Sequence, residues 1–90
     1  MARLVARANA LLAQGNISAA RSMLERAAEA GNVQASFTLA ETYDPLILPK
    51  WGVYGTRADA TKARELYAKA EAGGLSEAKA RFEALASVAQ

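Results

Sequence analysis

The chain repeats itself after 43 residues, and this internal repeat restricts the fold more than any other feature. When residues 16–39 are laid over residues 59–82 without a gap, one arginine and several small residues coincide. The coinciding pairs are Ala20/Ala63, Arg21/Arg64, Ala27/Ala70, Gly31/Gly74 and Ala35/Ala78. A repeat of this length is typical of stacked helical arrays, in which each unit buries its apolar face against a neighbouring unit. Such arrays usually bind other macromolecules.

The composition favours helices over strands. Alanine accounts for 23 of the 90 residues, and alanine has the highest helix propensity while burying little surface. Apolar and polar residues do not alternate over more than a few positions, so no strand is expected. A chain of this length has room for one small hydrophobic core. The sequence therefore predicts a single all-α domain of closely packed helices.

Charge and residue content exclude several kinds of function. The net charge of +2 is too small to indicate a nucleic-acid or anionic-membrane partner through bulk electrostatics. Histidine and cysteine are absent, which removes the usual zinc and haem ligands, the thiolate nucleophiles and the commonest general base. The nine carboxylates are spread over helix surfaces, and no nucleophile motif is present. We expect no enzyme activity, no metal and no cofactor.

Neither a signal peptide nor a membrane-spanning segment is predicted within these residues, and the sequence does not indicate a compartment. No apolar run approaches the roughly 20 residues that a membrane-spanning helix needs, and the first residues lack the uninterrupted apolar stretch of a signal peptide. The absence of cysteine fits either a reducing or an oxidising compartment. The helical pattern begins directly after Met1, as expected equally for a native start and for a piece cut from a longer protein.

Apolar stripes at helical spacing predict five helices. Asn16 and Asp59 stand at N-cap positions, whereas Gly31 and Gly74 stand where helices end. The turn at Gly31-Asn32 should be very tight, which forces the two helices it joins to be antiparallel neighbours. Glu77 is expected to pair with Arg81 on the outer side of the last helix. The helices are expected over residues 2–14, 17–30, 32–43, 59–72 and 75–88.

The segment 44–58 differs in composition from the rest of the chain. It contains both prolines and the only tryptophan. Asp44 and Pro45 should end the preceding helix and could open a single helical turn. The large apolar residues of the segment could form an exposed platform for a partner, or could fold back as a structural cap, which we favour. These residues are Leu46, Ile47, Leu48, Trp51 and Tyr54.

Two segments carry a resemblance to a known family. Residues 31–43, which read Gly-Asn-Val-Gln-Ala-Ser-Phe-Thr-Leu-Ala-Glu-Thr-Tyr, closely resemble the Sel1-like repeat signature. Residues 59–74 look like the family's second helix, and the first unit resembles a tetratricopeptide hairpin. The matching positions are Asp59, Lys62, Ala63, Leu66, Tyr67, Lys69, Ala70 and Gly74, and in the first unit Ala8, Leu11, Gly15, Ala20, Leu24 and Ala27.

The resemblance covers roughly residues 3–86 and implies a right-handed α-α solenoid of antiparallel helix hairpins, with about two and a half repeats. The chain departs from the family in the segment 44–58, which is longer and more aromatic than the usual connection. Arg7 also stands where the tetratricopeptide pattern prefers leucine.

The resemblance also implies a function. Proteins of this superfamily, often bacterial, act as non-enzymatic scaffolds or adaptors that bind a protein or peptide on the concave surface lined by the first helix of each hairpin. Residues expected to project into that surface are Val5, Asn9, Leu12, Gln34, Phe37, Thr38, Glu41, Glu77, Arg81 and Ala84. The candidate partner-binding residues are Gln34, Phe37, Thr38, Glu41, Glu77 and Arg81, together with Trp51 and Tyr54 of the loop.

Two other functions, and self-association of the chain, are also compatible with the sequence. A helix-turn-helix nucleic-acid binder could use Arg3, Arg7, Arg21 and Arg26, but acidic residues dilute these charges and no aromatic side chain is interleaved with them. A small ligand-binding or enzyme domain could use residues 44–58 as a lid. The first and last helices keep apolar stripes with no neighbour beyond them, which indicates self-association through the end helices or a longer parent chain.

Overall fold

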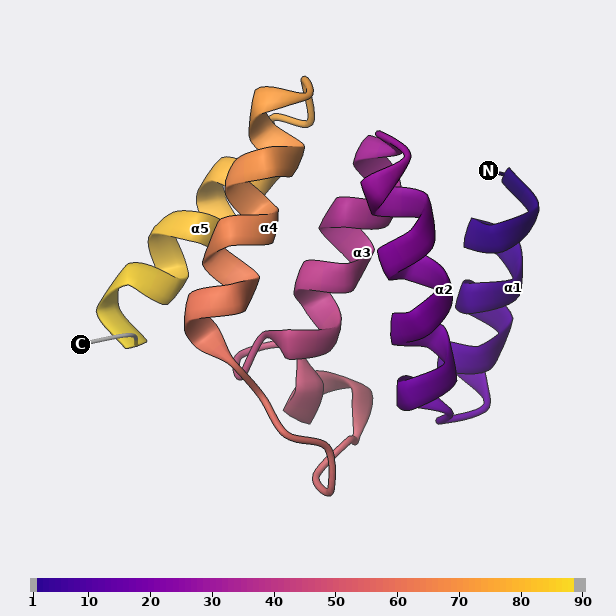
Figure 1. Cartoon of the computed structure of the whole chain (residues 1–90). Helices are drawn as coiled ribbons and strands as arrows, with labels where there is room; N and C mark the ends of the chain where they lie inside the picture. The colour runs from indigo at the N-terminus through magenta and orange to yellow at the C-terminus, as the bar shows by residue number, and fades with distance from the viewer. Residues whose placement is uncertain (1, 89–90) are drawn as a thin grey trace.

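The computed structural model describes residues 2–88, and these residues are built into helices and connecting turns (Figure 1). A short 3-10 helix, η1 (Leu48–Trp51), lies between the third and fourth α-helices. No strand forms within residues 2–88, so the expected all-α class with five main helices is confirmed. The α-helices are α1 (Ala2–Ala13), α2 (Ile17–Glu29), α3 (Val33–Tyr43), α4 (Ala60–Ala72) and α5 (Glu77–Val88).

The sequence repeat reappears in the hydrogen bonds that begin α2 and α4. The side chain of Asn16 accepts a hydrogen bond from the backbone N–H of Ala19 at 3.3 Å. The side chain of Asp59, 43 positions later, accepts the corresponding bond from Lys62 at 3.0 Å. Both caps satisfy an N–H group that the first turn of a helix leaves without a partner. The two predicted N-caps are therefore confirmed.

The same two helices also end alike. The N–H of Gly31 reaches the carbonyl of Ala28 at 2.9 Å, and the N–H of Gly74 reaches that of Glu71 at 2.9 Å. In both turns the next N–H bonds one residue further back along the helix, at 3.0 Å. Gly31 and Gly74 have positive φ angles of 94° and 106°, which glycine adopts without the steric cost that a Cβ brings. The sequence predicted that Gly31 and Gly74 end these helices, and the local backbone geometry confirms it.

The copies diverge at the start of α5. In α3 the side chain of Asn32 caps the helix by accepting a bond from Ala35 N–H at 2.9 Å. Leu75 stands at the corresponding place in the second copy and has no side-chain acceptor. We expected the last helix from residue 75, but it begins at Glu77.

The helices stand in a row in chain order, α1 to α5, and run alternately up and down (Figure 1). The helix pairs that pack closely are all consecutive in the sequence. The resulting body is flat, with extents of 34 × 30 × 16 Å. The central helix α3 is buried on nearly every side, because all of residues 35–40 are buried and six consecutive residues cover more than one full helical turn.

Small residues at the repeat positions set the spacing between helices. Ala20, Ala27, Ala63, Ala70 and Ala78 have no solvent-exposed surface. Alanine side chains at these contacts allow neighbouring helices to approach closely, as the sequence repeat predicted. The larger side chains fill the remaining space, and the rings of Phe37 and Tyr67 meet edge to face with centroids 5.4 Å apart.

Residues 44–58 leave the helical row and return to it, and we name them the aromatic loop. The loop projects beyond the helix ends at one end of the slab (Figure 1). Its ends are joined, because the N–H of Asp59 donates to the carbonyl of Tyr43 at 2.8 Å. Joined ends and internal packing are the features of an Ω-loop.

Candidate functional site

The predicted interaction surface of α3 is largely internal. Phe37 and Thr38 were expected to project into a concave, solvent-filled surface, but only 5% and 6% of their surfaces are exposed. This expectation was wrong, because the ring of Tyr67 from α4 packs edge to face against the Phe37 ring and the Arg81 guanidinium lies 5.1 Å from the Phe37 ring centre. Gln34 remains exposed and donates a weak bond to the Thr38 hydroxyl at 3.4 Å.

The structure brings Glu41 and Arg81 together, but the two side chains pair with each other. Arg81 Nη1 lies 3.0 Å from Glu41 Oε2, and this is the one ion pair within residues 2–88. The expected pairing of Arg81 with Glu77 was wrong, because the fold places Glu41 of α3 nearer to the guanidinium than the neighbour on its own helix. Glu77 is exposed. Of the six candidates on α3 and α5, Gln34 and Glu77 are the two exposed residues.

The ion pair belongs to a larger polar cluster that the sequence did not indicate. The Tyr67 hydroxyl donates to Asp44 Oδ2 at 2.7 Å and accepts from Arg81 at 3.3 Å. The other oxygen of Asp44 accepts from the N–H of Leu46 at 2.8 Å. Asp44 and Tyr67 have almost no exposed surface, at 1% and 0%. The cluster therefore ties α3, α4, α5 and the aromatic loop together.

Protonation in this cluster follows from burial and hydrogen bonding. Burial raises the pKa of the Glu41 carboxyl, against the opposing effect of the bond from Arg81. Burial, and then the bond to Asp44, raise the pKa of the Tyr67 phenol. Burial alone would lower the pKa of Arg81, but its bonds to Tyr67 and Glu41 outweigh that effect and the pKa rises. The phenol and the guanidinium hold their protons at neutral pH, so the cluster is a satisfied structural clamp.

The aromatic loop divides into a buried and an exposed part. Ile47 and Leu48 fold back into the protein, as the favoured cap interpretation predicted. Leu46 and Trp51 are only partly covered, with exposed fractions of 40% and 39%, and Tyr54 is largely exposed at 81%. The loop is therefore a cap on its inner side and an exposed aromatic surface on its outer side.

Arg21 of α2 holds the root of the aromatic loop. Its guanidinium donates to the carbonyl and hydroxyl of Thr42 and, at 2.9 Å, to the carbonyl of Arg57. It also lies over the ring of Tyr43, 3.8 Å from the ring centre. The repeated arginine of the sequence is thus a residue that joins the helical row to the loop.

A hollow of about 330 Å³ lies beside the loop, lined by Leu12, Ala13 and Trp51. Among the side chains that line it, only that of Trp51 carries a polar group, the indole N–H. A reaction or a tightly held ligand would need convergent polar groups. Among the described residues, this hollow carries no such arrangement.

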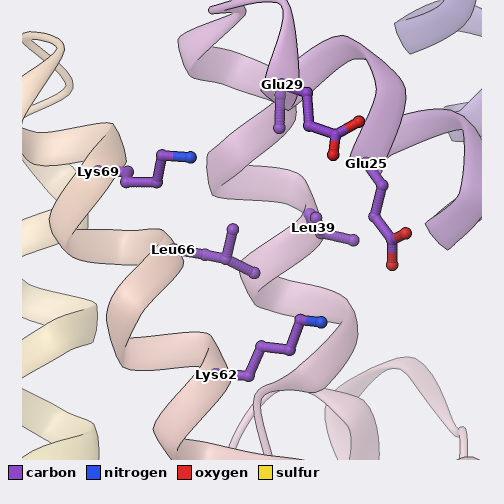
Figure 2. Close-up of a pocket in the computed structure, with 7 residues that line it drawn as sticks. Glu25, Glu29, Leu39, Lys62, Leu66 and Lys69 are labelled. Carbon is purple, nitrogen blue, oxygen red and sulfur yellow. The ribbon is translucent and has the colours of Figure 1, made fainter.

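A second hollow is a groove between α2 and α4, with α3 lying between its two walls (Figure 2). Its volume is about 190 Å³. Leu39 of α3 and Leu66 of α4 provide its apolar floor. Two carboxylates lie on the α2 side and two ammonium groups reach in from the α4 side (Figure 2). The charged residues are Glu25, Glu29, Lys62 and Lys69.

The two charged walls face each other without pairing. No ion pair forms between them in the described part of the chain. Glu25 accepts a long bond from the Tyr43 hydroxyl at 3.4 Å, and Lys62 Nζ lies 5.0 Å from the centre of the same ring. The walls are therefore available to groups of opposite charge on a partner.

The sequence contains one signal for this groove, in the spacing of two acidic residues on α2. Glu25 and Glu29 are four residues apart on one helix face, where like charges repel. A pair that costs helix stability suggests a use outside its own helix. The opposing lysines could not be matched to these glutamates from sequence, because α2 and α4 are separated by a whole helix.

Neither a metal centre nor a membrane span is found in the described part of the chain. No group of three or more potential ligand side chains gathers among residues 2–88. None of the helices there is both long and apolar enough to cross a bilayer. Comparison with protein-family models, curated proteins and solved structures finds no match for this chain. Fold and site together define an all-α protein. Its antiparallel helices form a flat row, and one open groove has acidic residues on one wall and basic residues on the other.

Proposed function

We propose that this chain is a non-enzymatic protein-interaction module that binds a peptide segment in the groove between α2 and α4. The architecture proposed with it is a right-handed Sel1-like or tetratricopeptide-like solenoid of about two and a half repeats. Packing between consecutive helices and the identical ends of α2 and α4 support this architecture. In a solenoid each unit contacts only its neighbours and offers a long open surface.

The observation that carries the proposal is the arrangement of charge around the groove. Carboxylates and ammonium groups stand on opposite walls above an apolar floor, and no ion pair within residues 2–88 joins them. A peptide with an apolar side chain over Leu39 and Leu66 would turn a cationic group toward α2 and an anionic group toward α4. Complementary charges of this kind fix the orientation of a partner and reject the reversed one.

The size of the groove favours a peptide side chain over a small metabolite. Its volume of about 190 Å³ is below the roughly 300–1,000 Å³ of most small-molecule sites. A single aliphatic side chain fits such a space, while the rest of the peptide lies along the helix surfaces. Helical grooves commonly bind peptides through a few anchor residues in this manner.

Selection from a phage-displayed library of random peptides tests the proposal. The wild-type chain should enrich peptides with an apolar residue between a basic and an acidic residue, and calorimetry should measure their affinity. In the variant Lys62→Glu with Lys69→Glu, binding of these peptides should weaken by at least about tenfold, because one charged wall changes sign. Amide chemical shifts in α2 and α4 should change on titration of the wild type.

The matched control is Arg3→Glu with Lys79→Glu, which changes the net charge equally at exposed sites outside the groove. This variant should bind the selected peptides as tightly as the wild type. If the groove variant binds them equally well, or if the shift changes fall on α3 and α5 near Gln34 and Glu77, the groove is not the binding site.

A further inference from the structure

The aromatic loop concentrates exposed apolar side chains at one end of the molecule. Four large apolar residues within the described chain are exposed, and three of them are Leu46, Trp51 and Tyr54. The loop also forms the tip that extends beyond the helix ends (Figure 1). The charged groove and the polar clamp use none of these three side chains. The tip is therefore a surface separate from the proposed peptide site.

The charged side chains on the outer side of the aromatic loop are all positive. Lys50 and Arg57 are exposed, and neither forms an ion pair within residues 2–88. The segment 45–58 contains no acidic residue. The carboxylate at the loop's start, Asp44, points inward and is occupied by Tyr67 and Leu46. The small net charge of the whole chain hides this local excess of positive charge.

Residue types and shape together favour a lipid surface over a protein partner. Tryptophan and tyrosine combine an apolar ring with a polar group and gather at membrane–water interfaces. Lysine and arginine beside them are attracted by anionic headgroups. A convex tip can enter a deformable bilayer surface, whereas a protein partner would need a preformed hollow for the Tyr54 ring.

The loop is also held in position before any contact is made. Its two ends are joined by the bond between Asp59 and Tyr43, and Arg21 anchors the carbonyl of Arg57. A fixed loop loses little conformational freedom when it binds, which favours association.

We propose that the tip of the aromatic loop docks onto anionic phospholipid surfaces. Trp51, Tyr54 and Leu46 enter the headgroup region, while Lys50 and Arg57 contact acidic headgroups. The helical row stays outside the bilayer, and the α2–α4 groove remains free to hold a peptide at the membrane surface.

Trp51 is the only tryptophan in the chain and reports directly on this contact. Titration with vesicles of phosphatidylcholine and phosphatidylserine, mixed roughly seven to three, should shift its emission to shorter wavelength. Vesicles of phosphatidylcholine alone should give a much smaller shift, and about 0.5 M salt should reverse most of the binding to anionic vesicles. Sedimentation of the vesicles gives the partition coefficient independently of fluorescence.

Two variants separate the apolar and the charged contributions. Lys50→Gln with Arg57→Gln should lower partitioning onto anionic vesicles by about thirtyfold at low salt, roughly fivefold for each cation. Tyr54→Ser with Leu46→Ser should lower partitioning at least about tenfold on the same vesicles. The control Arg3→Gln with Lys79→Gln removes the same charge elsewhere and should leave partitioning within about twofold of the wild type.

Three results would overturn the proposal. The first is a Trp51 emission that does not shift with either kind of vesicle, which would leave the exposed aromatic side chains to a protein partner. The second is an equal shift with neutral and anionic vesicles. The third is a control variant that loses as much partitioning as the loop variant. Circular dichroism of each variant verifies that the helices remain folded.

Discussion

The hydroxyl group of Tyr67 offers the sharpest test of how this fold is held together. Substitution Tyr67→Phe removes the hydroxyl and leaves the ring, so packing against Phe37 is retained. The lost bond to Asp44 is short, at 2.7 Å, and buried, whereas the bond from Arg81 is long, at 3.3 Å. Hydrogen bonds to charged groups contribute about 1.5–3 kcal/mol each. We expect Tyr67→Phe to lower the free energy of unfolding by about 2–3 kcal/mol, mostly through Asp44.

This loss is large for a domain of such size and is readily measured. A change of 1 kcal/mol shifts the midpoint temperature of a small domain by about 4–8 °C, so Tm should fall by roughly 10–20 °C. Urea denaturation followed by circular dichroism gives the free energy, and a thermal scan gives Tm. The slope of the urea transition should not change, because the surface exposed on unfolding is nearly the same.

Tyr54→Phe is the matched control, since it deletes the same atom from a side chain that is 81% exposed. It should change the free energy of unfolding by less than about 0.5 kcal/mol. If Tyr67→Phe costs no more than Tyr54→Phe, the clamp around Asp44 does not stabilise the fold and the reasoning is refuted.

Three further predictions concern pH, packing and the root of the loop. The pKa of Tyr67 is raised in the folded state, so above about pH 10 the phenol loses its proton in the unfolded chain before it does in the folded protein. The difference in free energy of unfolding between the wild type and Tyr67→Phe, measured by urea denaturation, should therefore shrink as the pH rises. Gly73→Ala should destabilise by about 1–3 kcal/mol, since its Cβ would overlap the side chain of Val33. Arg21→Ala should cost about 1–2 kcal/mol and accelerate hydrogen exchange in the aromatic loop, because it removes the bonds to Thr42 and the Arg57 carbonyl.

Each of these predictions has a control that the chain itself supplies. Gly55→Ala meets no atom within 4 Å and should leave Tm nearly unchanged, while Val33→Ala added to Gly73→Ala should recover part of the loss. Arg26→Ala removes an exposed arginine from the same helix as Arg21 and should not affect exchange in the loop. For the pH effect, a constant difference between wild type and Tyr67→Phe up to pH values well above 10 would contradict the raised pKa.

Local features were predictable because their causes lie within a few residues. Asn16, Asp59 and the two repeated glycines act through bonds that reach at most five positions along the chain. The end of α3 before Pro45 follows from steric contact with the preceding residue. Where a local signal was absent, as at Leu75, the prediction missed the helix start by two residues.

The partners of charged and aromatic side chains were not predictable in the same way. For Arg81 the sequence offered Glu77, four residues away, yet the fold supplied Glu41, forty residues away. Asp44 was assigned a capping role, and its bond to Tyr67 across 23 positions was not foreseen. In the aromatic loop, hydrophobicity alone could not separate the buried Ile47 from the exposed Tyr54.

The sequence by itself determined a row of five helices with repeated caps, glycine stops and small residues at the contacts. It did so because helix periodicity and capping are short-range effects, and the repeat applies them twice. The tertiary structure alone decided which side chains close into the Asp44–Tyr67–Arg81–Glu41 clamp and which remain open in the groove and on the loop. That choice depends on the distances between helices, and these are set by the packing of the whole chain.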